Sequence, residues 1–352
     1  MNKIIIPTGY MGSGSSAITD LVSEFDGYEA AKGSFEYVFL HCPNGVFDLE
    51  DKLLKGNNAI RSDEALHSFY STMRQLYDKK YWWVGNYKEN ISDKFWEITK
   101  EYIDSLIQYK PEFYWYYQEN TNVKMFFQLV IKRLVKCMSF GKITLKKPLL
   151  YSPMWISYIG EQEFYEKTRS YLWKILSELG IQEKNIVLDQ LLLPFNLHRM
   201  RNYFCDLNAE AFVVERDPRD VFITNKYVWS AQNEQVPYPI DVEEFCKVYR
   251  NLRSMEDMKT NFDNHIHRIH FEDLIYKYEE MCEYVQKILK QESIPMHVRK
   301  RQLFNPEKSI ENTQLFFGNE RYKKEVEIIE KLLPEYLYEF PYGRKTDMKK
   351  TF

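Results

Sequence analysis

The first residues suited to chemistry are the glycines and serines of segment 9–16, which reads GYMGSGSS. An apolar run, Ile4–Ile6, precedes this segment and an amphipathic run, Ala17–Phe25, follows it, an order that predicts strand, tight loop and helix. Because the loop carries little side-chain bulk, its backbone N–H groups can close around phosphate or sulfate at the positive end of the helix. The residues expected to form this anion-binding loop are Gly12, Ser13, Gly14, Ser15 and Ser16.

The spacing Gly9-x4-Gly14 is that of a nucleotide-binding P-loop, with one difference. Ser15 stands where a P-loop has its lysine. A loop without that lysine handles a triphosphate and Mg²⁺ poorly, which disfavours a kinase or NTPase. That reading stays open as an alternative, since Glu215 after an apolar strand resembles the acid of a Walker B motif.

A second group of candidate residues lies in segment 211–225, which reads AFVVERDPRDVFITN. A strand is predicted to end near Arg216, and Asp217-Pro218 begins a helix, where an early proline loses no hydrogen bond. Thr224 follows Arg216 by eight residues. A guanidinium offers two parallel donors that suit a phosphate, and a threonine hydroxyl can add another. The segment therefore predicts a second phosphate site.

Together the two segments resemble the sulfotransferases that use 3′-phosphoadenosine-5′-phosphosulfate (PAPS). In that family a first-strand loop holds the 5′-phosphosulfate. The 3′-phosphate is held by an arginine at a strand end and by a hydroxyl residue eight places later, roles that the resemblance assigns to Arg216 and Thr224. Two later stretches are also similar to the family, His270–Leu274 (HFEDL) and Asn305–Asn312, which is similar to a loop that closes over the nucleotide.

The chain departs from the family pattern at Gly12, where the family usually carries Lys or Arg to neutralise charge on the bridging oxygen. Three explanations stay open. Another cation reaches the loop, the loop N–H groups and serine hydroxyls suffice, or the protein binds the nucleotide without good catalysis. The candidate cations are Lys32, Lys146, Lys147 and Arg219.

Transfer to a hydroxyl group also needs a general base, because the attacking oxygen loses its proton. The candidates are Asp189, His41 and His198. Asp189 follows the predicted strand Ile186–Leu188, at the sheet edge where the first loop is expected. The resemblance implies a base near that strand, often His and sometimes Glu.

Apolar strands that alternate with helices predict an α/β fold, in which helices cover both faces of a central parallel sheet. The resemblance implies the version found in P-loop nucleoside-triphosphate hydrolases, with ligands beyond the strand C-terminal ends. We expect one domain over residues 1–352, with a mostly helical insertion at about 59–140 that includes aromatic clusters at 81–83 and 113–117. The expected strands are Ile4–Ile6, Phe35–Leu40, Ile186–Leu188, Ala211–Val214 and Ile266–His270, and a long helix is expected at Glu161–Leu179.

The composition disfavours several classes of protein. A formal net charge of −3 over 352 residues creates no global field for nucleic acid or an anionic membrane. The five cysteines lack CxxC spacing, and Cys and His show no metal-ligand spacing. No apolar run approaches the length of about 18 residues that a membrane span needs. We therefore expect a cytoplasmic protein with free thiols, no metal site and no transmembrane segment.

These observations lead to the expectation of a PAPS-dependent sulfotransferase that acts on a hydroxyl of a carbohydrate or glycolipid. The acceptor class rests on the tendency of the family and on the abundant aromatic residues, whose faces stack on sugar rings. The main alternative is a sulfotransferase-like protein that binds a nucleotide or glycan without catalysis, and the missing loop lysine is its chief support.

Overall fold

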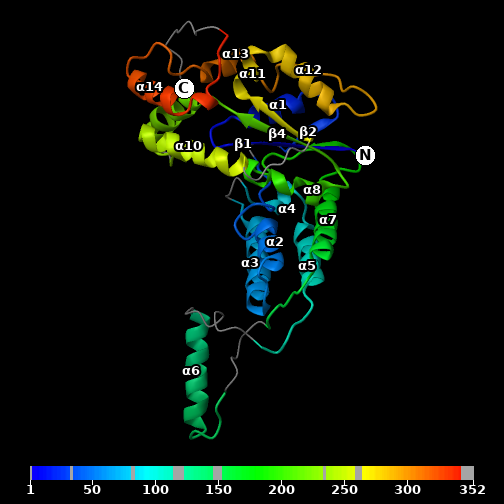
Figure 1. The fold of residues 1–352 in the computed structure, drawn as a ribbon. Coiled ribbons are helices and arrows are strands. Elements are labelled where there is room, and N and C mark those ends of the chain that lie inside the picture. The colour runs from blue at the N-terminus through cyan, green and yellow to red at the C-terminus, as the bar shows by residue number, and fades with distance from the viewer. Residues whose placement is uncertain are drawn as a thin grey trace. The chain divides into compact units, whose positions relative to one another are not determined.

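The computed structural model describes residues 2–31, 35–80, 84–113, 123–145, 153–232, 235–257 and 264–341 (Figure 1). Contacts divide the chain into two compact units. The first comprises Met1–Cys42, Leu76–Phe95 and Leu172–Phe352, and the second comprises Pro43–Gln75 and Trp96–Tyr171. Lys32, Lys146, Lys147 and the aromatic residues 81–83 and 114–117 lie outside the described residues.

The first unit contains a central parallel sheet. Within the described residues its five strands lie in the order β2-β3-β1-β4-β5, and every neighbouring pair is parallel. The strands are β1 (Lys3–Gly9), β2 (Tyr28–Ala30), β3 (Asn185–Val187), β4 (Asn208–Glu215) and β5 (Ile266–His270). The two central strands, β1 and β4, are buried along almost their whole length, as expected for a sheet covered on both faces. The predicted α/β fold with a parallel sheet is confirmed.

The predicted strand at Phe35–Leu40 is wrong, because the strand after the first helix is the shorter Tyr28–Ala30. The segment 35–40 has no strand pairing and instead runs along the end of β3. The Tyr37 N–H donates to the carbonyl oxygen of Asp189 at 2.9 Å. The Val38 N–H donates to the hydroxyl of Tyr87 at 2.9 Å. The apolar run reflects burial of this irregular segment, which a sequence pattern does not distinguish from a strand.

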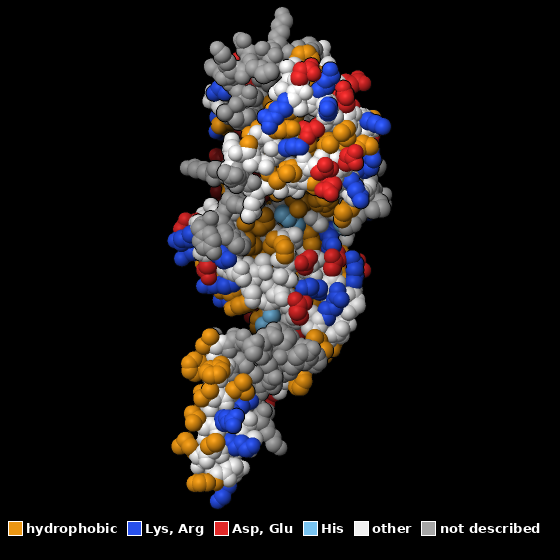
Figure 2. Space-filling view, turned by 90° about the vertical axis from the view of Figure 1, so that its left-hand side faces the viewer, with side chains coloured by type: hydrophobic (Ala, Val, Ile, Leu, Met, Phe, Trp, Pro, Cys, Tyr) orange, Lys and Arg blue, Asp and Glu red, His pale blue; other side chains and the backbone are white. Residues whose placement is uncertain are grey.

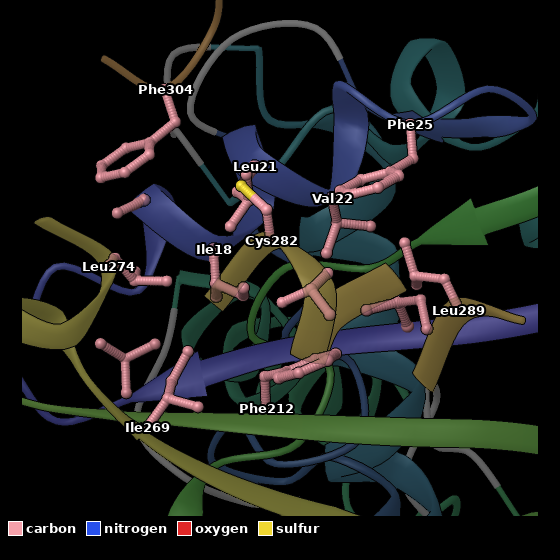
Figure 3. Packing of buried hydrophobic residues seen from close by; sticks show 14 of the residues in the cluster. Ile18, Leu21, Val22, Phe25, Phe212, Ile269, Leu274, Cys282, Leu289 and Phe304 are labelled. Atoms are coloured by element: carbon pink, nitrogen blue, oxygen red, sulfur yellow. The ribbon is translucent and has the colours of Figure 1, made fainter. Parts of the chain in front are cut away.

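One face of the sheet is covered by α1 (Ser16–Ser23), α11 (Phe271–Tyr276) and α12 (Tyr278–Leu289), which lie above it in Figure 1. Their apolar side chains pack with Phe212 and Ile269 of the sheet, as Figure 3 shows. Ile18, Leu21 and Val22 of α1, with Phe25 just after the helix, belong to this cluster and follow the i, i+3, i+4, i+7 pattern. This packing fixes the direction of α1, and therefore of the loop before it.

A second apolar cluster joins α9 (Pro218–Ile223), α10 (Val242–Asp257) and α14 (Lys323–Leu332). Between α9 and α10 the chain continues as a π-helix, Thr224–Trp229. The other short helices of the first unit are α4 (Tyr87–Asn90), η2 (Pro194–Arg199), α8 (Met200–Phe204), η4 (Ser230–Gln232), α13 (Pro306–Ser309), η5 (Ile310–Asn312) and η6 (Pro334–Tyr336).

The second unit is helical. Its helices are α2 (Val46–Leu54), most of α3 (Ala59–Asp78), most of α5 (Phe95–Leu106), α6 (Val123–Met138) and the first part of α7 (Glu161–Glu178). Aromatic packing joins α5 to α7, since the rings of Tyr102 and Tyr171 stack with centroids 4.4 Å apart. The helix predicted at Glu161–Leu179 is confirmed, and so is the helical pattern in the described part of 59–140. Among the described residues, no helix is both long and apolar enough to cross a membrane.

Candidate functional site

The candidate site lies in the first unit, at the edge of the sheet where the parallel strands end. β1 ends at Gly9, and the loop 10–15 leads into α1 at Ser16. Gly12 and Gly14 have φ angles of +76° and +81°, in the left-handed region that side chains disfavour. A Cβ added to Gly14 would lie 2.9 Å from a ring carbon of Phe271, the first residue of α11. Glycine is therefore needed at position 14 both for its backbone angle and for this close approach.

The serines of the loop lie in three different environments. The Ser13 hydroxyl is buried and has no hydrogen-bond partner among the described residues. The Ser15 hydroxyl accepts a hydrogen bond from Nε2 of Gln190 at 2.9 Å, and Ser16 is exposed at the start of α1. A buried hydroxyl with an unused donor is costly unless a ligand or water supplies an acceptor, so Ser13 is a candidate contact for an anion in the loop.

Arg216 directly follows β4, and its guanidinium contacts the glycine-rich loop. Its Nη1 donates to the carbonyl oxygen of Gly12 at 2.9 Å, and its Nη2 donates to the carbonyl oxygen of Asn312. The guanidinium carbon lies 5.2 Å from the centre of the Phe271 ring. All four stretches that carry the family resemblance thus meet around Arg216. Nε of Arg216 is buried without a partner among the described residues.

Thr224, the second predicted phosphate contact, is buried where α9 passes into the π-helix. Its hydroxyl donates to the carbonyl oxygen of Asp220 at 2.8 Å, one turn earlier. A serine or threonine hydroxyl bonded in this way can rotate to another acceptor, because the carbonyl also accepts the helical N–H bond.

Buried carboxylates hold Arg216 and its neighbours in place. Asp220 accepts hydrogen bonds from the N–H groups of Gln314 and Leu315 at 2.8 and 2.7 Å. Glu272 accepts the N–H of Asp217 at 2.9 Å, while its other carboxylate oxygen has no partner among the described residues. Burial raises the pKa of the Asp220 carboxyl and raises the pKa of the Glu272 carboxyl to about 8. The Asp220 bonds fasten the segment that follows Asn312 over the end of β4, and the Glu272 bond joins α11 to the turn after β4.

Arg219, one of the predicted loop cations, is occupied in an ion-pair network away from that role. Its Nη2 donates to Asp217 at 2.7 Å and its Nη1 donates to Glu330 at 2.8 Å. The side chain is buried, and these two carboxylates raise the pKa of its guanidinium against the effect of burial. Arg219 is therefore a structural residue of the turn rather than a free positive charge.

Two of the three predicted bases, Asp189 and His41, lie beside the loop. Gln190, the residue after Asp189, bonds Ser15 through its side chain and accepts a hydrogen bond at its carbonyl from Nε2 of His41 at 2.8 Å. Burial raises the pKa of Asp189 to about 6, and burial lowers the pKa of His41. Oδ1 of Asp189 is buried with no partner among the described residues. His198 is exposed on η2.

Glu36 is a carboxylate of this site that sequence reasoning missed. Burial, followed by the negative charge of Asp189, raises the pKa of Glu36 to about 7. Two neighbouring carboxyl groups with raised pKa values are a common arrangement for proton transfer. Glu36 lies in the irregular segment after β2, so only the tertiary structure brings it to Asp189.

Arg253 is a second missed residue, and its guanidinium lies against the loop residue Tyr10. The guanidinium carbon is 3.5 Å from the centre of the Tyr10 ring and 3.8 Å from that of Tyr249. One nitrogen donates to the Tyr249 hydroxyl at 2.9 Å, while Nη1 is buried with no partner among the described residues. A signal was present in the sequence, because Arg253 falls one turn after Tyr249 on the apolar stripe of α10.

In comparisons with known proteins, no family model and no curated protein sequence matches the chain.

Proposed function

We propose that the protein is a sulfotransferase that moves a sulfuryl group from PAPS to a hydroxyl of a carbohydrate or glycolipid. The observation that carries the proposal is the hydrogen bond from Arg216 to the carbonyl of Gly12, at 2.9 Å. It brings the two segments suited to bind phosphate together at the C-terminal edge of a parallel sheet, where such sheets bind nucleotides.

The donors and the shape of the loop fit a nucleotide with two phosphorylated ends. The backbone N–H groups of Gly12, Gly14, Ser15 and Ser16, together with the hydroxyl of Ser13, would hold the 5′-phosphosulfate at the start of α1. Arg216 and Thr224 would hold the 3′-phosphate, since Nε of Arg216 has no partner among the described residues and the Thr224 hydroxyl can turn toward a new acceptor. PAPS would supply the sulfuryl group, which bonds to the acceptor oxygen as its bond to the 5′-phosphate breaks.

Asp189 is our choice of general base. A carboxyl group with a pKa of about 6 is mostly ionised at neutral pH and yet basic enough to accept the proton of an attacking hydroxyl. The free Oδ1 gives it an unused acceptor, and Glu36 beside it can share the proton. His41, held by the carbonyl of Gln190, would position this end of β3.

Arg253 is our choice for the cation that replaces the usual basic residue at position 12. Its buried guanidinium is in direct contact with a loop side chain. Nη1 has no partner among the described residues and is therefore available for a ligand. Its place between two tyrosine rings restrains the side chain, so little entropy would be lost on binding.

The proposal is tested by two assays on the full chain. The first incubates the protein with sulfur-labelled PAPS and a panel of glycans and glycolipids and looks for a labelled product. The second measures binding of 3′,5′-ADP and 5′-AMP by calorimetry, with Arg216→Ala and Arg216→Lys beside the unchanged protein. Loss of a charged hydrogen bond should weaken 3′,5′-ADP binding by about 1.5–3 kcal/mol and leave 5′-AMP binding nearly unchanged.

The outcomes separate the alternatives. Labelled product together with the Arg216 effect supports a sulfotransferase. Binding of 3′,5′-ADP that depends on Arg216, without product on any acceptor, favours a nucleotide-binding protein without catalysis. Tight ATP binding that depends on Mg²⁺, with no preference for a 3′-phosphate, would favour a kinase or NTPase instead.

A further inference from the structure

Helix α6 of the second unit presents an unusually exposed apolar face. This face consists of Val123, Phe126, Phe127, Val130, Ile131, Leu134 and Met138. Their spacing of three and four residues places them on one side of the helix. Their exposed fractions run from 38% at Val130 to 81% at Met138, and Phe140, just after the helix, is 93% exposed. Figure 2 shows hydrophobic side chains gathered along this helix, which is found at the bottom of the view.

The charge of the surrounding segment is entirely positive. Between Glu119 and Glu161 the chain contains seven lysines and arginines and no aspartate or glutamate. Within α6 itself, Lys132, Arg133 and Lys136 lie on the side of the helix away from the centre of the apolar face. The chain as a whole has a net charge of −3, so this positive segment is a local feature that whole-chain charge conceals.

We propose that α6 binds the surface of a membrane that contains anionic lipids, with its axis in the plane of the interface. The apolar face would enter the acyl-chain boundary, and the lysine and arginine side chains would contact lipid headgroups. A helix of 16 residues is about 24 Å long, too short to span a hydrocarbon core of about 30 Å, which agrees with a helix that lies on the membrane.

Charge complementarity favours an anionic lipid surface over a second copy of the chain as the partner of this apolar face. Two copies of α6 packed through their apolar faces would leave these lysines and arginines on the outside of the pair, with no acidic residue in the segment to neutralise them. An anionic lipid surface attracts each of those charges by about 1 kcal/mol and also accepts the phenylalanine rings. The inference is independent of the proposed enzymatic function, because it uses none of the residues of the candidate site.

The test is flotation of the full-length protein with vesicles of about two-thirds phosphatidylcholine and one-third phosphatidylglycerol, beside vesicles of phosphatidylcholine alone. We expect binding to the anionic vesicles that weakens as salt is raised. Lys132→Gln with Arg133→Gln should weaken the partition coefficient about thirty-fold, from about 1 kcal/mol for each charge. Phe126→Ser with Phe127→Ser should weaken it about a hundred-fold or more.

Matched controls use residues exposed elsewhere. Lys323→Gln with Lys324→Gln removes two charges from α14, and Met296→Ser removes a side chain that is 67% exposed. Both controls should bind like the unchanged protein, and thermal unfolding should report all variants as folded. The proposal is overturned if the α6 variants bind like the controls, or if the anionic vesicles bind no protein. It is also overturned if sedimentation shows a dimer that the phenylalanine variant dissociates, without vesicle binding.

Discussion

The close contact between the loop and α11 predicts a specific cost for Gly14→Ala. An alanine at a φ of +81° costs about 1–2 kcal/mol of backbone strain. The new Cβ would also lie 2.9 Å from the Phe271 ring. That ring is 6% exposed and has the Arg216 guanidinium against it, so it cannot easily move. Overpacking of this kind adds about 1–3 kcal/mol.

Gly27→Ala is a matched control in the same unit. Its φ is +79°, almost the same as at Gly14, but an added Cβ would meet its nearest atom at 3.6 Å, an ordinary contact. The control variant should therefore be destabilised by the backbone strain alone. By thermal unfolding, Gly14→Ala should melt about 2–12 °C below Gly27→Ala, since 1 kcal/mol shifts the midpoint by about 2–4 °C in a unit of this size.

A third variant separates the backbone strain from the overpacking against Phe271. Gly14→Ala combined with Phe271→Leu should recover part of the loss, because the smaller side chain makes room for the methyl group. Equal melting temperatures for Gly14→Ala and Gly27→Ala, together with no recovery in the double variant, would refute the packing of the loop on α11 and with it the shape of the anion site.

Three further predictions concern the charged groups. Asp189→Asn should lower kcat by about a hundred-fold or more, and should abolish the rise of rate with pH through about 6 that a carboxylate base produces; a profile unchanged in shape would remove Asp189 from that role. Arg253→Gln should lower kcat by about a hundred-fold, whereas Arg250→Gln on the exposed side of the same helix should leave it nearly unchanged, and equal rates for both would exclude Arg253 as the loop cation. Burial raises the pKa of Glu272 to about 8 in the folded protein, against about 4.5 for an exposed glutamate, so its contribution to stability falls as pH rises through that range. The Glu272→Gln variant should therefore lose less free energy of unfolding across that pH range than the unchanged protein, as measured with denaturant. Equal pH dependence of the two free energies would contradict the raised pKa.

The sequence predicted the site's backbone framework well, for a topological reason. Parallel strands end at one edge of their sheet, so an arginine after β4 and a glycine loop after β1 were expected to lie together. The register of β1 and β4, which places Gly9 opposite Val214, brings the two segments together. The strand at Ile266–His270 was also predicted with its correct bounds.

Side-chain partners were harder to predict, because they depend on distant contacts. Glu36 lies in a run that was mistaken for a strand, and nothing in its neighbours indicates Asp189 as a partner. Arg219 was predicted as a possible loop cation, yet its partner Glu330 is 111 residues away. Spacing along the chain carries no information about such pairs.

The bond from Arg216 to Asn312 has a consequence for synthesis of the protein. The two residues are 96 positions apart, and Asp220 is likewise tied to residues 94 and 95 positions later. A ribosome therefore synthesises the five described strands before it synthesises Asn312, whose carbonyl holds Arg216. A nascent chain halted after Tyr278 would contain the five described strands and the glycine loop, but Arg216 would lack its bond to Asn312. The proposed binding of a nucleotide should therefore develop only late in translation.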